Sequence, residues 1–232
     1  MDISKGKLFF GFLCLFLLIH SAAAAQVPPL MTAPSGGTIG TPSKAEILGE
    51  FMDLALDLKN PSSGHSVTKW ARPSVSVKVV GDTDEKSRYC LAEDIGEINN
   101  LTGSVDLRIT GSGASDIDIN FIPLEEFPLS VTGYSAGSEG DTSCVSQKGF
   151  LHKCSIWVPT TGVDEGTRCT ILLHEITHAM GLFGHSEHGE SILFQGTTAR
   201  GYSPLDREVL RLLYNQALSP GFTEETVRGY FS

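Results

Sequence analysis

Apolar residues recur along the chain with two periods. Apolar residues three and four positions apart indicate amphipathic helices, and segments in which every second residue is apolar indicate strands. The helical period predicts helices at residues 43–58, 84–99, 169–180 and 203–213. Alternation, together with one short apolar run, predicts strands at residues 75–79, 105–109, 117–121 and 156–158. The order α-β-α-β-β-β-α-α predicts an α+β or three-layer arrangement, with a mixed sheet over helices.

The first and last of these helices have clear start signals. Ser43 and Glu46 have the spacing of a capping box, in which each side chain bonds the backbone N–H of the other residue. Ser203, Pro204 and Asp206 combine an N-cap hydroxyl, a proline in the first turn and an acid at the third position. Both helices should therefore begin directly after these serines.

Two segments precede the predicted domain. Within residues 1–25, two lysines are followed by an apolar run and a small-residue stretch, which is the pattern of a signal peptide; an uncleaved membrane anchor is the alternative. Residues 26–43 are rich in proline and glycine and predict a linker. Residues 44–232 are numerous enough for one domain. We therefore expect a secreted, extracellular protein (periplasmic in a bacterium) that does not contact the membrane after cleavage.

The acidic balance of the chain limits its partners. The formal net charge is −10, and cleavage after residue 25 makes it −11. A surface of this sign repels phosphate groups, which argues against nucleic acid or an anionic membrane as a partner.

Four cysteines lie outside the predicted signal peptide: Cys90, Cys144, Cys154 and Cys169. An even number in an exported chain is typical of two disulfides, which can connect in three ways. Cys144 and Cys154 bracket a short segment containing Gly149, as a disulfide across a hairpin would, and this leaves Cys90 to pair with Cys169. A zinc site of cysteine and histidine is the competing interpretation, but no C-x-x-C spacing supports it.

The predicted third helix carries an H-E-x-x-H motif formed by His174, Glu175 and His178. Residues four apart lie on one side of a helix, so the two histidines can reach a single Zn²⁺. Glu175 lies next to the helix face that carries the two histidines, where it can accept a proton from a zinc-bound water. Gly181 can end the helix in a left-handed conformation, which lets His185 return to the metal as the third ligand.

Other interpretations of the motif stay open. The helix could be an amphipathic core helix that carries two surface histidines. The third ligand could be His188, or an acid on the last helix such as Glu208, in place of His185. Ca²⁺ is a second possible ion, because Asp116 and Asp118 alternate towards one face of a predicted strand, although no EF-hand pattern is present.

The segment 174–186 resembles the zinc signature of the metzincin peptidases and is most similar to that of the matrixin branch. The segment 114–121 resembles the matrixin strand just upstream of the substrate-binding edge, and 203–214 resembles the closing helix of that family. The resemblance covers most of residues 65–215 and implies that the predicted domain, residues 44–232, is a metzincin-like zincin domain. Such a domain has a twisted mixed sheet with a backing helix, an active-site helix and a C-terminal helix.

The resemblance also implies a metalloendopeptidase. His174, His178 and His185 would bind one catalytic Zn²⁺, and Glu175 would act as the catalytic base on the zinc-bound water. A protein or peptide substrate would pair with an edge strand, which is either the strand containing Ile119 or the one containing Ile156. Tyr202 is expected to pack against the last helix, and stabilisation of the oxyanion is its alternative role.

The chain departs from the matrixin pattern at two places. His185 lies seven residues after His178, one more than in the family, and Gly184 is the extra residue, which can form a bulge. No methionine follows Met180, so the methionine turn beneath the metal is missing and Leu193 takes the corresponding place. These departures motivate an alternative function, a catalytically inactive secreted binding module on a metzincin scaffold.

Overall fold

The structure is a computed structural model that describes residues 40–61 and 63–231, and the fold below is that of the unit Thr41–Ser232. The predicted signal peptide and most of the predicted linker lie outside the described residues. Within the described residues, no helix combines the length and the apolar character needed to cross a membrane.

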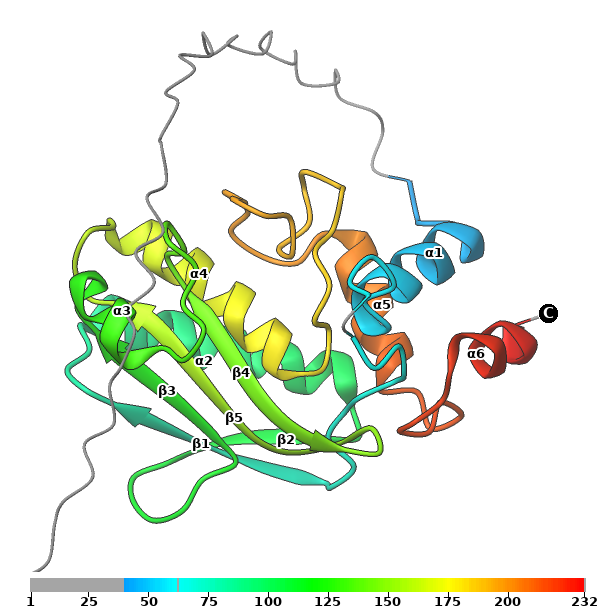
Figure 1. Ribbon diagram of the computed structural model, residues 1–232, viewed down its shortest axis with the longest axis horizontal. Helices are drawn as coiled ribbons and strands as arrows, with labels where there is room; N and C mark the ends of the chain where they lie inside the picture. The colour runs from blue at the N-terminus through cyan, green and yellow to red at the C-terminus, as the bar shows by residue number, and fades with distance from the viewer. Residues whose placement is uncertain (1–39, 62, 232) are drawn as a thin grey trace, which may run out of the picture. The chain divides into compact units, whose positions relative to one another are not determined.

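The unit contains one five-stranded mixed sheet, with helices packed against one of its faces (Figure 1). Its strands are β1 (Ser74–Val80), β2 (Asp106–Thr110), β3 (Ile117–Ile122), β4 (Asp141–Gln147) and β5 (Phe150–Pro159), in the spatial order β2-β1-β3-β5-β4. β1 pairs in parallel with β2 and β3, and β3 pairs in parallel with β5. β4 runs antiparallel to β5 and forms one edge of the sheet.

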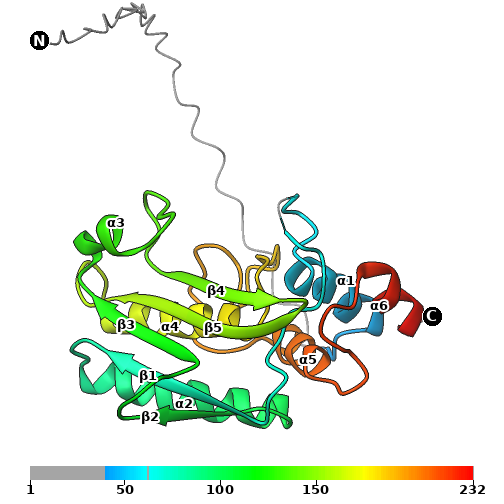
Figure 2. The same cartoon turned by 60° about the horizontal axis from the view of Figure 1, so that its bottom comes forward.

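The helices are α1 (Lys44–Ala55), α2 (Glu85–Thr102), α3 (Phe127–Ser130), α4 (Glu165–Ala179), α5 (Pro204–Leu213) and α6 (Glu224–Phe231), with a 3₁₀ turn at Leu124–Glu126. Figure 2 shows α2 and α4 against the same face of the sheet. α4 contacts β4 and β5, α2 contacts β2, and the two helices pack against each other. α5 packs against both α1 and α2.

The alternation in β3 explains how the sheet faces these helices. Ile117, Ile119 and Phe121 are buried in the core, whereas Asp118 and Asn120 between them are half-exposed. Because successive side chains of a strand point to opposite faces, the apolar set lies under the helices and the polar set lies on the other face.

All eight predicted helices and strands are present among the described residues. The capping boxes at Ser43 and Ser203 both form, as predicted. α4 begins at Glu165, four residues before the predicted start, because the Asp164 carboxylate accepts a hydrogen bond from the Thr167 N–H and caps the helix there. The helix therefore begins at a polar cap that the apolar period does not include.

The sequence did not predict β4, and this changes the expected substrate edge. Its polar sequence has no apolar alternation, because an edge strand with exposed faces does not need one. β3 and β5, the strands that contain Ile119 and Ile156, each lie between two other strands. The expectation that one of them forms the substrate edge is therefore wrong, and β4 is the edge strand on this side of the sheet.

The predicted pairing of the cysteines is confirmed. Cys144 and Cys154 form a disulfide across the β4–β5 hairpin, where the two residues are direct partners in the strand register. Cys90 on α2 and Cys169 on α4 form the second disulfide. The second bridge ties together the two helices that lie on the sheet, and two disulfides are typical of a protein that folds in an oxidising compartment.

Candidate metal centre

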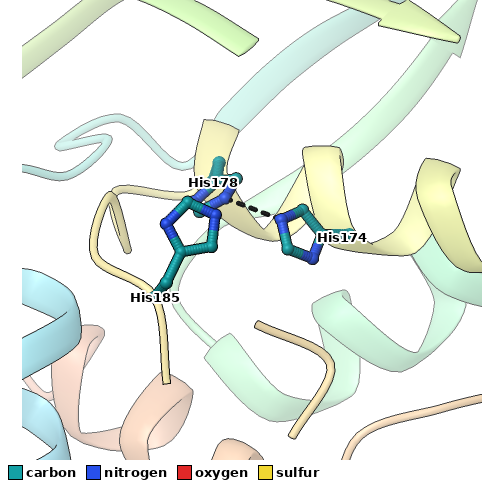
Figure 3. A group of neighbouring side chains, drawn as sticks. All are labelled: His174, His178 and His185. Atoms are coloured by element: carbon teal, nitrogen blue, oxygen red, sulfur yellow. Dashed lines mark hydrogen bonds between the residues drawn. The ribbon is translucent and has the colours of Figure 1, made fainter. Parts of the chain in front are cut away.

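The last turns of α4 carry two imidazole rings that lie side by side, nearly perpendicular to each other (Figure 3). His174 and His178 are one turn apart, and their Nε2 atoms are separated by 3.0 Å. His178 is buried and His174 is half-buried. The two rings therefore present ring nitrogens to the same point in space, as the four-residue spacing predicts.

Gly181 ends α4 and turns the chain back towards these rings. Its φ is +108°, the region that glycine adopts most readily, and a Cβ there would lie 1.9 Å from the carbonyl oxygen of Thr68. The chain then continues through residues 181–190, which we call the 181–190 loop. This loop brings the ring centroid of His185 to 5.4 Å from that of His174 and 5.0 Å from that of His178.

The three rings together could hold a metal ion. One ring nitrogen from each of His174, His178 and His185 lies within 4.8 Å of the other two. Figure 3 shows the rings of His174 and His178 on the helix and that of His185 on the following segment. The structure thus brings together all three of the histidines that the sequence predicts as ligands.

Backbone carbonyls fix the outer nitrogen of two of the rings. Nδ1 of His174 lies 2.7 Å from the carbonyl oxygen of Ile192, and Nδ1 of His178 lies 2.6 Å from that of Leu182. A carbonyl can only accept, so each Nδ1 must donate a hydrogen and each Nε2 keeps its lone pair. This is the arrangement in which a second contact sets the tautomer of a metal-binding histidine.

The donor set fits a cation. Two unprotonated Nε2 atoms at 3.0 Å repel each other unless a positive charge lies between them. Zinc–nitrogen bonds of about 2.0–2.1 Å are long enough for one ion to bond both atoms. The residues present therefore suit Zn²⁺, with His185 as a third nitrogen donor.

Burial keeps the imidazoles of His174 and His178 in the form that binds metal, whereas the His185 ring is exposed. Desolvation lowers the pKa of His174 to about 4, and it lowers the pKa values of His178 and His185 as well. The neighbouring imidazoles add to this lowering for His178. All three rings are neutral near pH 7, and neutral imidazole is the form that binds zinc.

Glu175 lies beside the histidines and is 6% exposed. Burial raises the pKa of its carboxyl to about 8; a hydrogen bond from Thr142 acts against this rise, and the charge of Asp141 adds to it. The Thr142 hydroxyl lies 2.7 Å from Oε2 of Glu175. Gly140 leaves room for the other oxygen, since a Cβ there would lie 2.6 Å from Oε1. The carboxyl group is thus held between α4 and the start of β4.

A cleft of about 670 Å³ opens over this group of side chains. Its walls come from residues 135–140 and the start of β4, from α4, from the 181–190 loop and from residues 195–197. The three histidines and Glu175 all line it, together with Asp141 and Thr142 from β4. The candidate ligands and the candidate base therefore face one space that is large enough for part of a peptide.

Residues 191–194 hold in place the backbone carbonyl that contacts His174. Asp206, the capping acid of α5, accepts hydrogen bonds from the Ser191 hydroxyl at 2.5 Å and from the Ile192 N–H at 2.9 Å. This holds the Ile192 carbonyl against His174. Leu193 is 1% exposed, and its carbonyl accepts from the N–H of Ser186 at 3.0 Å. Leu193 is thus part of the apolar core, at the place where the sequence predicts a substitute for the missing methionine.

The alternative third ligands lie elsewhere. Glu208 forms an ion pair with Arg211 on the outside of α5. His188 is exposed, and its nearest acidic partner is Glu50 at 3.5 Å. Neither residue belongs to the group of side chains that converges with His174 and His178.

The predicted calcium ligands are paired with cationic side chains. Arg72 lies 2.5 Å from Asp116, and Lys153 lies 2.6 Å from Asp118. Asp116 also accepts bonds from the backbone N–H and the hydroxyl of Ser76. These contacts occupy the carboxylates that the calcium hypothesis requires.

Tyr202 is a packing residue. Its side chain is buried, its hydroxyl lies 2.8 Å from Oγ1 of Thr177, and it does not line the cleft. The alternative in which Tyr202 stabilises an oxyanion is therefore wrong for this arrangement of the chain, because the hydroxyl faces the interior behind α4.

Sequence reasoning missed Thr142 and the two carbonyls of Leu182 and Ile192. Thr142 belongs to the strand that the apolar pattern does not reveal. A backbone carbonyl carries no sequence signal at all, since each residue has one. The capping acid Asp206 was recognised, but its second role in holding the Ile192 N–H was not.

Comparison with known proteins supplies the family. A family model described as "Protein of unknown function (DUF2927)" matches residues 44–232. The chain belongs to this family. No curated protein matches this DUF2927 protein.

One similar solved structure is titled "Structure of myroilysin". It has a TM-score of 0.39 and 14% sequence identity, and the match covers 64% of this DUF2927 chain and 96% of that chain.

Proposed function

We propose that this DUF2927 protein is a secreted zinc-dependent endopeptidase. The observation that carries the proposal is the pair of carbonyl contacts to His174 and His178. They direct two unprotonated Nε2 atoms at one point, beside a third imidazole from His185. A buried carboxyl group, Glu175, lines the same cleft. This combination of three nitrogen donors and one neighbouring acid is typical of a catalytic zinc site.

The three histidines would hold the zinc ion. When bound by three imidazoles, zinc has an open fourth position, lowers the pKa of water and polarises a carbonyl group. His174 and His178 are already oriented by their carbonyl contacts, so little rearrangement is needed on binding.

Glu175 would move the proton. Its ionised carboxylate would take a proton from the attacking water on one of its Oε atoms and then give it to the leaving amine. Thr142 orients the carboxyl through its hydroxyl, and the second oxygen lies next to Gly140, which also lines the cleft.

β4 would bind the substrate backbone. It is the terminal strand of the sheet, and its start lines the cleft next to Glu175. An extended peptide that pairs with the free edge of β4 would run over the histidines. Such pairing recognises the backbone of the peptide, which supports a protein or peptide substrate.

Digestion of a peptide library by the purified protein tests this function. We expect cleavage that a zinc chelator abolishes and added Zn²⁺ restores. Glu175→Gln should reduce the rate about 10²- to 10⁴-fold while zinc stays bound. Glu165→Gln, at an exposed acid in the first turn of the same helix, should cleave as the wild type does.

Two results would overturn the proposal. Zinc-loaded wild-type protein that cleaves no peptide of the library would favour the inactive binding module. A Glu175→Gln variant that cleaves at the wild-type rate would remove Glu175 from the mechanism and leave the hydrolysis without its base.

A further inference from the structure

α1 lies against the loop that carries the third histidine. The N–H of Gly184 donates a hydrogen bond of 2.9 Å to the carbonyl oxygen of Leu54, in the last turn of α1. A Cβ on Gly184 would lie 2.1 Å from the carbonyl oxygen of Asp53. Only a glycine fits here without displacement of the backbone. The residue directly before His185 is therefore in van der Waals contact with the main chain of α1.

The residues after His185 are also held by α1. The carboxyl group of Glu50, which is 6% exposed, lies beside the side chain of Ser186. The ring of His188 lies 3.5 Å from the same carboxylate. α1 thus contacts the 181–190 loop on both sides of the histidine, through a backbone contact before it and a side-chain contact after it.

A third link joins the same two segments at the surface. Lys59, just beyond α1, lies 2.9 Å from both Asp53 and Glu187. An exposed ion pair of this kind contributes little energy, but it joins the same two segments as the contacts of Gly184 and Glu50. The contacts together cover residues 184–188 of the loop.

We propose that α1 positions the third zinc ligand, and that Gly184 and Glu50 are the positioning residues. His174 and His178 are fixed by the helix and by two carbonyls, whereas no hydrogen bond to the His185 ring is found among the described residues. The orientation of His185 therefore depends on the backbone that carries it. Gly184 is the residue that lengthens the spacing between the second and third histidines, and its contact with α1 gives that extra residue a function.

This inference rests on the metal site of the proposed function and not on peptide hydrolysis. It goes beyond that function because it proposes that α1, a helix outside the cleft, determines part of the zinc affinity. A protein that binds zinc without cleaving peptides would reject the proposed function and leave the inference standing.

Two glycines of the same loop provide a matched pair of variants. Gly184→Ala should displace the loop, because its Cβ cannot fit against Asp53. Gly189→Ala should have no such effect, because nothing lies within 4 Å of a Cβ at that position. Zinc affinity is measured by competition with a chromophoric chelator, and coordination is measured by the visible absorption spectrum of the Co²⁺-substituted protein.

We expect Gly184→Ala to weaken zinc binding about 10- to 100-fold, as loss of a positioning contact around a metal does, and to change the Co²⁺ spectrum. Gly189→Ala should keep the wild-type affinity and spectrum. Wild-type affinity in Gly184→Ala would overturn the role of α1, because the displaced backbone would then have no effect on His185.

Glu50 gives a second test in case Gly184→Ala does not fold. Oε1 of Glu50 has no hydrogen-bond partner among the described residues, so an apolar replacement removes a buried, partly unsatisfied carboxylate and is compatible with folding. Glu50→Leu should weaken zinc binding about tenfold, and Glu50→Gln, which keeps a polar group beside Ser186 and His188, should restore most of it. Equal affinities in the wild type and Glu50→Leu would overturn the inference for this residue.

Discussion

Thr142 on β4 and Glu175 on α4 are joined by a hydrogen bond of 2.7 Å, in which the threonine hydroxyl donates to Oε2 of the carboxylate. The same hydroxyl lies 3.0 Å from the backbone carbonyl of Glu175. The bond connects the edge strand that would bind a peptide with the acid that would take a proton from the attacking water. It therefore links substrate position and base position within the cleft.

Replacement of this hydroxyl should lower catalysis more than substrate binding. Thr142→Val keeps the shape of the side chain but cannot donate, so the Glu175 carboxyl loses its fixed orientation. We expect kcat to fall about tenfold with KM within about twofold of wild type, and Thr142→Ser to restore most of the rate. Steady-state kinetics on one cleaved peptide measure this. An unchanged kcat in Thr142→Val would show that the bond does not orient the base.

Substitution of Gly181, the glycine that follows α4, should destabilise the folded protein. An alanine there would have a φ of +108° and a Cβ 1.9 Å from the Thr68 carbonyl oxygen. We expect Gly181→Ala to lower the free energy of unfolding by about 2–4 kcal/mol. Gly96→Ala in α2, where nothing lies within 4 Å of the new Cβ, should raise it by about 1 kcal/mol. Urea unfolding of both variants compares them, and equal stabilities would contradict the close packing at Gly181.

Asp94 on α2 should make the stability of the protein depend on pH. Burial raises its pKa from 3.8 to about 7, with smaller contributions from the charges of Glu97 and Glu93. The folded state then holds this proton more tightly than the unfolded state. The folded state is therefore penalised as the pH rises from about 4 to about 7, and the penalty is complete above that range.

Asp94→Asn removes this ionisation and should stabilise the protein only where the penalty acts. At pH 8 we expect the variant to exceed the wild type by about 2 kcal/mol in the free energy of unfolding, after allowance for partial solvent screening. At pH 4 the two should be equal within about 0.5 kcal/mol. Urea titrations at both pH values measure the difference. A stabilisation of the same size at pH 4 would assign the effect to something other than the charge.

Much of the fold could be predicted from interactions between residues that are close in the sequence. The capping boxes at Ser43 and Ser203 form because a hydroxyl and an acid three residues apart bond each other's backbone N–H groups, and no distant residue is required. The buried strands were visible because one face of the sheet is apolar. The hairpin disulfide of Cys144 and Cys154 was predictable because only a short segment separates the two residues.

The parts that the sequence did not reveal depend on distant contacts. β4 is polar, since its faces are exposed, and only its pairing with β5 makes it a strand. The fit of Gly184 against Asp53 joins residues that are far apart in the chain. The same holds for the site: the H-E-x-x-H spacing predicts two converging histidines, but the carbonyl that anchors His174 comes from Ile192 and could be identified only in three dimensions.

Isothermal titration calorimetry, in which Zn²⁺ is added to the metal-free protein, tests the central claim most directly. Convergence of His174, His178 and His185 predicts one equivalent of Zn²⁺ per chain. It also predicts that His178→Ala abolishes this binding, while His152→Ala, at an exposed histidine of β5, leaves it unchanged. A wild-type protein that binds no zinc, or a His178→Ala variant that binds it as tightly as the wild type, would contradict the account.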